Sequence, residues 1–217
     1  MGQAKQRGTY EQRVQEALNN NSIRQQCQQE YNLSPRFFNK MIAHTGNDVI
    51  RCDYEPYPFA KQLRCFDNAE QYANLIGGKV VYGWIMMPSH PQTDADYTRI
   101  GIAEMQQHAV VEDKLGRIIC VTPYDANGEE QIDKIGGDME YNVDLNRYFW
   151  RDDKCNLPNR YDNLMYVPNT GAGRRYQREY PDIQHIELGE LGNLIPENYP
   201  SYYRAKYATE SLVLEPA

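Results

Sequence analysis

Residues 63–87 have the sequence LRCFDNAEQYANLIGGKVVYGWIMM, and their pattern changes half-way along. In the first half, apolar residues recur at spacings of three and four, which predicts an amphipathic helix that starts near Cys65. Gly77 and Gly78 end this pattern, and the next residues are mostly β-branched or aromatic, as is typical of a strand. A helix followed directly by a strand indicates a fold that contains both elements.

Two further helices are expected on the N-terminal side of this stretch. The sequence TYEQ at residues 9–12 matches a capping box, with Thr9 as N-cap and Gln12 three residues later. It predicts one long polar helix or two short ones up to about Tyr31. Ser34 and Pro35 begin a second, more apolar helix, which Gly46 ends.

A hairpin is expected on the C-terminal side. After a loop at residues 88–97, the runs HAVVED (108–113) and RIICVTP (117–123) are separated by a short turn, which favours two antiparallel strands. Beyond Pro123 the strand and helix signals weaken. Residues 169–175, NTGAGRR, have a loop-like composition and lack the Lys-Ser/Thr pair of a phosphate-binding loop.

These elements predict an α+β fold in which N-terminal helices pack on a small antiparallel sheet. We expect a helical segment at residues 1–50, a core that carries the chemistry at residues 51–168, and an irregular tyrosine-rich extension at residues 169–217. A chain of 217 residues is long enough for one compact domain with a sizeable core. The three segments are therefore expected to form a single domain.

Composition limits the classes of partner. A net charge of −7 disfavours the phosphate attraction on which most nucleic-acid binding depends, and no long apolar run predicts a membrane span. The five cysteines are odd in number and form no CxxC pair, which favours free thiols and a reducing compartment. We expect a cytoplasmic protein of a bacterium or a phage-infected host, with a protein, peptide or small molecule as its ligand and no cofactor.

Cys65 and His108 are the candidate catalytic pair. A helix N-terminus favours the thiolate form of a cysteine, and a histidine on a neighbouring strand is the usual base in thiol hydrolases with this chain order. Gln62, or the backbone N–H of Cys65, is the candidate oxyanion donor. Asn68, Trp84 and His90 are candidate substrate contacts, although the structural interpretations, a loop cap, a core aromatic and a solvated loop residue, are the favoured ones.

Several short motifs occur in an order that resembles a group of little-characterised bacterial and phage proteins. They are Cys65-x-x-Asn68, Gly77-Gly78, Gly83-Trp84, His108-Ala109-Val110, and Val121-Thr122-Pro123. The resemblance covers roughly residues 65–163. It implies a papain-like or NlpC-like core with a Cys-His-Asp arrangement.

One position departs from that resemblance. Where the group has an aspartate before Val-Thr-Pro, this chain has Cys120. A neutral thiol is a weak acceptor and gives an imidazole little orientation. Asp125, Asp113 or Asn142 could replace it, a Cys-His dyad could act alone, or the protein could have lost catalysis and kept binding.

The register of the hairpin determines which side chains face His108. With Glu112 opposite Arg117, Cys120 points away from His108, whereas a shift of one residue places the two on the same face. In the second register, Cys65, His108 and Cys120 could also form a metal site, although isolated ligands without close spacing make a metal the weaker interpretation.

The sequence thus leads to two hypotheses. The first is a thiol hydrolase or acyl transferase that acts on an amide, isopeptide or thioester bond through Cys65 and His108. The alternative is a catalytically inactive phage or bacterial binding or inhibitor protein that uses the same cleft or the tyrosine-rich tail, which includes Tyr199, Tyr202, Tyr203 and Tyr207.

Overall fold

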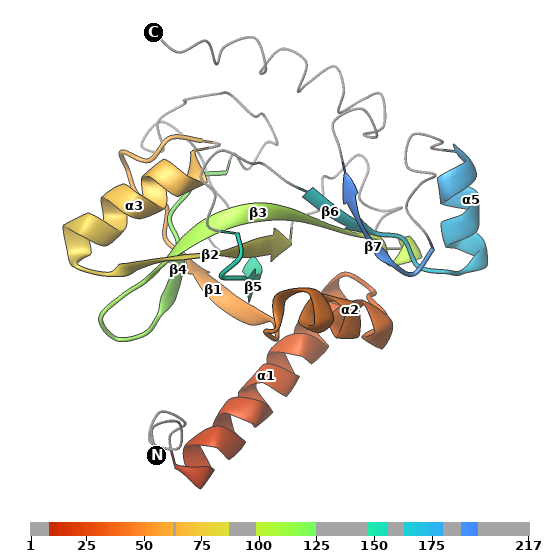
Figure 1. Ribbon diagram of the computed structural model, residues 1–217, viewed down its shortest axis with the longest axis horizontal. Coiled ribbons are helices and arrows are strands. Elements are labelled where there is room, and N and C mark those ends of the chain that lie inside the picture. Colours follow the sequence, from red (N-terminus) through yellow and green to blue (C-terminus); the bar gives the residue numbers. More distant parts are fainter. Residues whose placement is uncertain are drawn as a thin grey trace, which may run out of the picture.

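The protein was analysed as a computed structural model that describes residues 9–62, 64–86, 99–124, 147–155, 163–179 and 188–194. The described part contains both helices and strands, as expected (Figure 1). The helices are α1 (Tyr10–Glu30), α2 (Pro35–Thr45), α3 (Cys65–Ile76) and α5 (Gly171–Glu179). The strands are β1 (Ile50–Tyr54), β2 (Lys79–Met86), β3 (Ala103–Glu112), β4 (Ile118–Cys120), β5 (Arg147–Arg151), β6 (Asn163–Tyr166) and β7 (Leu191–Leu194).

Five of the strands close into a small barrel. The order β2-β5-β1-β4-β3 returns to its start because β3 also pairs with β2. The first half of β3 pairs with β6, and β6 with β7, so these two strands extend the sheet beyond the barrel. We expected an antiparallel sheet, but β1 and β4 run parallel.

Alternate residues of the five strands fill the interior of the barrel. One hydrophobic cluster takes side chains from every barrel strand: Cys52, Tyr54, Val81, Ile85, Val110, Cys120 and Phe149. Successive side chains of a strand point to opposite faces. The residues next to these interior ones therefore point outward and pack against the helices. The barrel therefore separates an interior cluster from two exterior ones.

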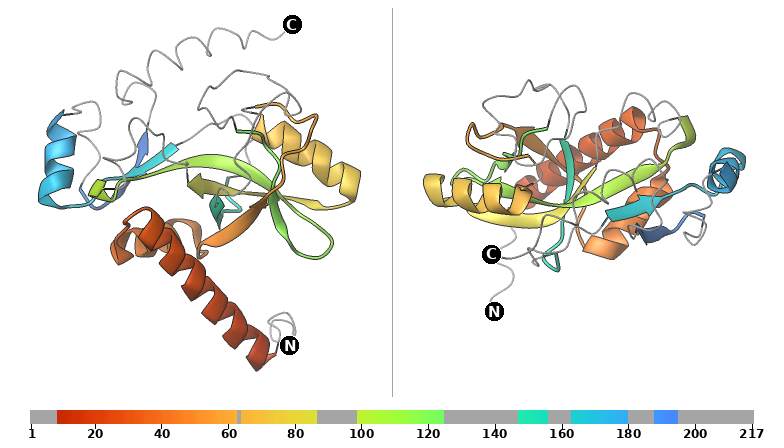
Figure 2. Two further views of the ribbon diagram at one scale, coloured as in Figure 1. Left: turned by 180° about the vertical axis from the view of Figure 1, so that it is seen from behind. Right: turned by 90° about the horizontal axis from the view of Figure 1, so that it is seen from above.

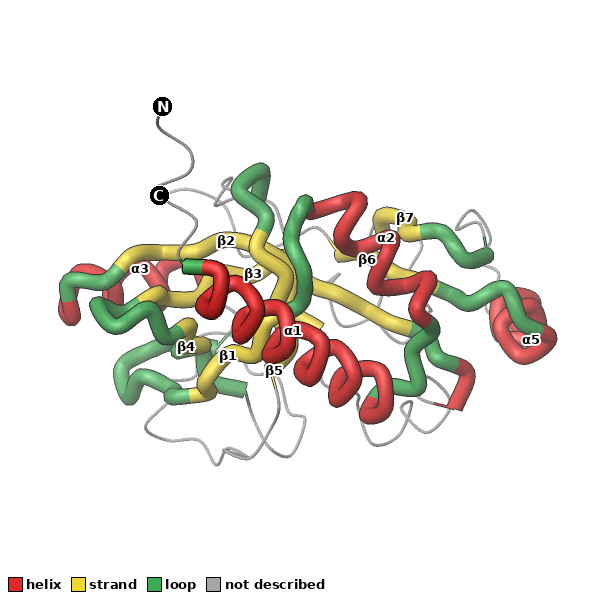
Figure 3. Tube along the Cα trace, turned by 90° about the horizontal axis from the view of Figure 1, so that it is seen from below, coloured by secondary structure: helices red, strands yellow, loops and turns green. Residues whose placement is uncertain are grey.

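The helices α1 and α2 cover one part of the outer surface. Phe37, Phe38 and Met41 of α2 are completely buried against outward-facing aromatic residues of β2 and β5, including Trp84 and Trp150. Seen from below, α1 crosses in front of the barrel strands (Figure 3). The capping box at Thr9 is present, and α1 forms one long helix rather than two short ones.

The helix α3 covers a different part of the outer surface. Phe66, Ala69 and Ala73 pack on Ala109 and Val111 of β3, in a cluster that also includes Ile119 and Val121. Figures 1 and 2 show α3 and α1 on opposite sides of β2 and β3. The stretch from Cys65 to Met86 thus forms the expected helix and strand, joined through a left-handed Gly77.

Four elements, β5, β6, α5 and β7, form in the second half of the chain, where the sequence had predicted only irregular structure. The aromatic residues Tyr148–Trp150 belong to β5, a barrel strand that sequence signals had left within an irregular connection. Residues 171–179 form a helix rather than a loop, with Thr170 accepting a hydrogen bond from the N–H of Gly173 at its start. In the described part of the chain, no helix has the length and apolarity needed to cross a membrane.

Candidate active site

Cys65 is the first residue of α3 and its side chain lies against the outer face of β3. The helix starts here because Arg64 leaves the helical conformation, and Asp67 places a negative charge in the first turn. The thiol is only 5% exposed and belongs to the cluster that joins α3 to Ala109, Val111 and Val121. The sequence prediction of a cysteine at a helix start is therefore confirmed.

Burial dominates the acid–base properties of this thiol. Loss of hydration raises the pKa of Cys65 to about 12, even though its sulfur accepts hydrogen bonds from the backbone N–H groups of Ala109 and Phe66. In the conformation described here Cys65 is therefore a neutral thiol at neutral pH. The helix N-terminus alone does not make it a thiolate.

His108 points into the barrel. It is two residues from Val110 on the interior face of β3, it lies opposite Gly83 of β2, and it is 7% exposed. Burial, with a smaller contribution from the positive charge of Arg147, lowers the pKa of His108 to about 3. The imidazole is thus neutral in this environment.

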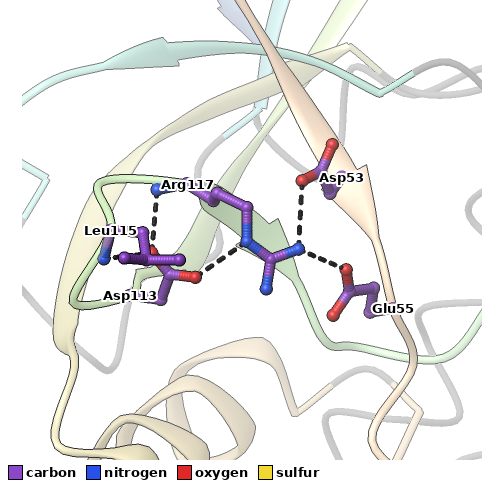
Figure 4. A network of polar contacts seen from close by, with 5 residues as sticks. All are labelled: Asp53, Glu55, Asp113, Leu115 and Arg117. Carbon is purple, nitrogen blue, oxygen red and sulfur yellow. Dashed lines mark hydrogen bonds and ion pairs between the residues drawn. The ribbon is translucent and has the colours of Figure 1, made fainter.

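A polar network fixes the turn that sets the hairpin register (Figure 4). Asp113 accepts hydrogen bonds from the backbone N–H groups of Leu115 and Arg117 and from the Arg117 side chain. The Arg117 guanidinium also binds Glu55 at 2.9 Å and lies 3.6 Å from Asp53, which joins the turn to β1. Asp113 is therefore a turn residue and does not approach His108.

The register places Cys120 beside His108. Val111 pairs with Ile119 and Glu112 with Ile118, which is one residue away from the alternative that closes the turn at Arg117. Cys120 consequently faces the interior, and its Sγ lies 3.2 Å from Nε2 of His108. The position at which the resemblance implies an aspartate is the position that contacts the imidazole.

Cys65 and His108 are close in the fold but face opposite sides of β3. Cys65 contacts the outer face through Ala109, whereas the adjacent His108 points inward to Cys120. Among the described residues, no hydrogen bond joins the two side chains. Both residues therefore lie at β3, but their side chains do not make the direct contact that the sequence hypothesis assumed.

Asn68 has a structural role in this arrangement. It is 2% exposed, its carbonyl accepts from the N–H of Lys61, and its amide donates to the Lys61 carbonyl and to Thr122 Oγ1. These bonds attach the segment before Cys65 and the end of β4 to α3. Of the two interpretations of Asn68 from sequence, the cap of a loop matches the observed contacts.

We expect Asn68→Ala to lower the free energy of unfolding by about 2–3 kcal/mol, because it removes three hydrogen bonds of a buried amide, two to the backbone of Lys61 and one to Thr122. Thr122→Val is the matched comparison: it removes one side-chain acceptor and keeps the shape, so we expect a loss of about 1 kcal/mol. Urea denaturation of both variants measures the difference. Equal losses would show that the bonds to Lys61 add nothing to stability.

The other sequence candidates occupy different places. Gln62 is 1% exposed in the segment that Asn68 holds, three residues before Cys65. Trp84 faces outward into the hydrophobic cluster that packs on α2, where its indole N–H donates to Asp152. It is therefore a core aromatic residue. His90, Asp125 and Asn142 lie outside the described residues.

Within the described ranges, no group of three side chains has an arrangement that could hold a metal ion. The combination of Cys65, His108 and Cys120 therefore does not form the metal cluster that the second register had allowed. The reason is geometric, since Cys65 lies on the outer face of β3 and the other two residues lie inside the barrel.

Arg147 is a residue of this region that sequence reasoning missed. It opens β5 opposite Cys52, is 4% exposed, and its charge acts on His108, Cys52 and Cys120. It was not predicted because it lies in a stretch of sequence with weak strand signals. The three consecutive aromatic residues at positions 148–150 show no alternation of polar and apolar side chains, so the sequence did not indicate an inward-facing arginine.

Comparisons of this chain with protein-family models, curated proteins and solved structures gave no match.

Proposed function

We propose that the protein is a thiol hydrolase or acyl transferase that acts on an amide, isopeptide or thioester bond. Cys65 is the nucleophile, His108 is the general base, and Cys120 is the group that orients the imidazole. The observation that carries this proposal is the 3.2 Å contact between Nε2 of His108 and Sγ of Cys120.

The contact with Cys120 assigns different roles to the two ring nitrogens of His108. A partner on Nε2 fixes the orientation of the ring and leaves Nδ1 as the nitrogen that can accept a proton. Cys65 lies against Ala109 on the other face of β3, so proton transfer to Nδ1 requires that α3 and β3 rearrange when the substrate binds. Catalytic contacts are commonly long in the absence of substrate and shorten when it binds.

The neutral state of both groups favours general-base catalysis over a preformed ion pair. In this scheme Sγ of Cys65 attacks the carbonyl carbon while its proton passes to Nδ1 of His108, and the imidazolium then protonates the leaving group. The N–H of Cys65 and the amide of Gln62 are the proposed oxyanion donors. Hydrolysis of the resulting acyl-enzyme, or its transfer to an amine, regenerates the thiol.

The order of elements supports a papain-like or NlpC-like core as part of this proposal. A cysteine begins a helix, a histidine follows on a strand that packs on that helix, and the third group lies on the next strand. This is the order implied by the resemblance of the motifs between Cys65 and Pro123. The five-stranded barrel and its parallel pair are features that the resemblance did not specify.

Electrophilic labelling tests the proposal without knowledge of the substrate. An iodoacetamide-type probe at neutral pH, followed by mass mapping, should label Cys65 at least tenfold faster than Cys155, and His108→Ala should remove that advantage. Cys155 is the matched internal control because it is 4% exposed, against 5% for Cys65. Equal, slow labelling of both thiols would contradict the proposal.

The pH dependence of the same reaction gives a second criterion. Without a base, a thiol with a pKa of about 12 reacts only through its thiolate, so in His108→Ala the rate should rise about tenfold per pH unit between pH 6 and 9. With His108 as the base, the wild-type rate should change by less than about threefold per unit over that range. Parallel pH profiles in the two proteins would argue against proton transfer to His108.

A second function is favoured by a different observation. Burial keeps the Cys65 thiol neutral, and His108 bonds Cys120 rather than Cys65. Both facts suit a protein that retains the fold for binding a protein, peptide or small molecule without catalysis. Uniform labelling of the thiols, combined with a normally folded His108→Ala variant, would favour this alternative.

A further inference from the structure

Arg147 brings a positive charge into the interior of the barrel. Its side chain lies on the interior face because Arg147 alternates with the buried Phe149 along β5, and the residue is 4% exposed. An arginine stays charged in proteins, and a buried charge without a counter-charge is strongly unfavourable. The burial of this cation therefore calls for a negative charge close to it.

The titratable groups that share the interior with Arg147 do not supply that charge. Burial raises the pKa of the Cys52 and Cys120 thiols and of the Tyr54 hydroxyl, so all three are neutral at neutral pH. Burial lowers the pKa of His108, which is neutral as well. Among these described groups Arg147 is thus the one permanent charge.

The nearest acidic residues along β1 bind a different cation. Asp53 and Glu55 flank Tyr54 in the sequence, are about half exposed, and contact the guanidinium of Arg117. Because neighbouring side chains of a strand point to opposite faces, these two carboxylates lie outside the barrel. A negative charge for Arg147 therefore has to come from a group other than these described side chains.

Two tyrosines fix the position of the Arg147 guanidinium. Its carbon is 4.3 Å from the ring centre of Tyr54 and 5.4 Å from that of Tyr124. The Tyr54 hydroxyl accepts hydrogen bonds from the backbone N–H of Tyr124, at 2.8 Å, and from Arg147 itself. Aromatic faces attract a cation but carry no net negative charge. The rings thus orient the guanidinium without neutralising it.

The remaining donors of Arg147 lie on one edge of the guanidinium. Nε and Nη2 are buried and have no hydrogen-bond partner among the described residues. Nη2 is the terminal nitrogen on the same side as the Nε–H, so the two N–H groups run parallel and form a two-pronged fork. This edge of an arginine matches the two oxygens of a carboxylate.

The fork lies at one end of the barrel. The parallel strands β1 and β4 both end there, at Tyr54 and Cys120, and the antiparallel strand β5 begins there with Arg147. His108 belongs to the same end, because its Nε2 lies 3.2 Å from Sγ of Cys120 and the charge of Arg147 acts on it. An anion bound by the fork would therefore share this part of the interior with the imidazole.

Charge and the number of donors favour a carboxylate over a phosphate. A carboxylate brings one negative charge and two oxygens, which match one guanidinium and two parallel N–H groups. A phosphate monoester brings a charge of about −1.5 to −2 and three terminal oxygens. In a buried site with a single cation it would leave excess negative charge and an oxygen without a donor.

We propose that the fork of Arg147 binds the carboxylate group of a ligand at the barrel end formed by Tyr54, Cys120 and Arg147. The inference goes beyond the proposed function, because it concerns binding and holds whether or not Cys65 is a nucleophile. The carboxylate belongs to a small organic acid or to the C-terminus of a peptide, which present the same two oxygens. Its binding converts the buried cation into a hydrogen-bonded ion pair and so stabilises the folded protein.

Thermal unfolding of the full chain in sodium acetate tests this inference. We expect acetate to bind with a dissociation constant of about 1 mM, within the limit for so small a ligand. Acetate at about 100 mM should then raise the unfolding midpoint by about 5–10 °C relative to the same concentration of sodium chloride. Arg147→Met should abolish this rise. No rise in the wild-type protein, or an equal rise in Arg147→Met, would overturn the inference.

Arg151→Met is the matched control. Arg151 lies on the same strand as Arg147, but its side chain is 47% exposed and binds Asp153. Its replacement removes an arginine from β5 without touching the barrel interior, so the acetate-dependent rise should stay at the wild-type size. Loss of the rise in Arg151→Met as well would show that acetate acts on the surface charge of the protein, and would contradict a site at Arg147.

Two further measurements keep the inference testable if Arg147→Met does not fold. Arg147→Lys retains the charge but not the fork, and it should bind acetate at least about tenfold more weakly than the wild-type protein. In the wild-type protein the Nε–H NMR resonance of Arg147, identified by its contacts with the Tyr54 ring, should shift and saturate as acetate is added. Unchanged affinity in Arg147→Lys, or an unchanged Nε–H resonance, would count against the fork.

Other probes define the ligand class. Inorganic phosphate should bind at least about tenfold more weakly than acetate, and tighter binding of phosphate would overturn the assignment to carboxylates. Triglycine and its C-terminal amide separate the two sources of the carboxylate: binding of triglycine that exceeds acetate and is lost in the amide supports a peptide C-terminus, and binding of acetate alone supports a small acid. None of these readouts uses the labelling of Cys65, so either proposal can fail without the other.

Discussion

Replacing Cys120 by alanine is expected to lower the rate of Cys65 alkylation at neutral pH by about a hundredfold, whereas Cys120→Asp should keep the wild-type rate or exceed it. Alanine removes the thiol whose Sγ lies 3.2 Å from Nε2 of His108, so the imidazole loses the partner that sets its orientation and tautomer. Loss of the orienting carboxylate in a serine protease triad costs about 10⁴ in turnover, which sets the upper limit. Aspartate supplies a charged acceptor to His108 and a negative charge near Arg147, whose Nε and Nη2 have no hydrogen-bond partner among the described residues.

The two substitutions at Cys120 distinguish the alternatives that the sequence left open. Equal rates for wild type and Cys120→Ala would show a Cys-His dyad, and a large gain in Cys120→Asp alone would show that the wild-type thiol orients His108 poorly. Cys155→Ala is the control, because Cys155 is a buried thiol in the cluster of α1 and α2 and its loss should leave the Cys65 rate unchanged. Denaturation curves of all variants would separate lost reactivity from lost folding.

Gly83→Ala is expected to remove most of the stability of the barrel, with a loss of more than about 4 kcal/mol. A Cβ on Gly83 would lie 2.0 Å from the carbonyl oxygen of Trp150 and 2.6 Å from the ring of Phe149. The first contact is with backbone of the paired strand β5, so a side-chain rotation cannot relieve it. The strand pairing that closes the barrel on this side would have to separate.

Gly171→Ala is the control for this substitution. A Cβ at Gly171 would meet no atom within 4 Å, so the free energy of unfolding should change by no more than about 0.5 kcal/mol. Denaturation midpoints and the yield of folded protein measure both variants. A Gly83→Ala protein with wild-type stability would show that β2 and β5 are not packed as closely as described.

The local elements near Cys65 were predictable because their signals lie in contiguous residues. Helical periodicity, a cysteine at the helix start and the two glycines at its end all occur between Cys65 and Gly78. The hairpin of residues 108–113 and 117–123 was predicted for the same reason, since its turn separates two apolar runs by a few residues, although β3 begins earlier, at Ala103, and β4 ends at Cys120. The strand β5 was not predicted, because its pairing partners β1 and β2 lie far away in the chain.

The candidate site was predicted in part. The sequence indicated Cys65, His108 and Cys120 as the relevant residues but gave two registers for the hairpin. The turn network around Asp113 and Arg117 selects one of them, and a shift of one residue would have moved Cys120 to the other face. Arg147 could not be inferred, because its burial depends on closure of the barrel around it.

The sequence by itself determined the mixed α and β content, the helix that begins at Cys65, and the hairpin formed by the strands that carry His108 and Cys120. These features depend on hydrophobic period, glycine positions and turn length, all of which act over fewer than about twenty residues. Only the tertiary structure decided that His108 and Cys120 point into a closed barrel with Arg147 while Cys65 stays outside it. Side-chain direction there depends on which distant strands pair and in which register, and burial within the barrel then sets the charge of each group.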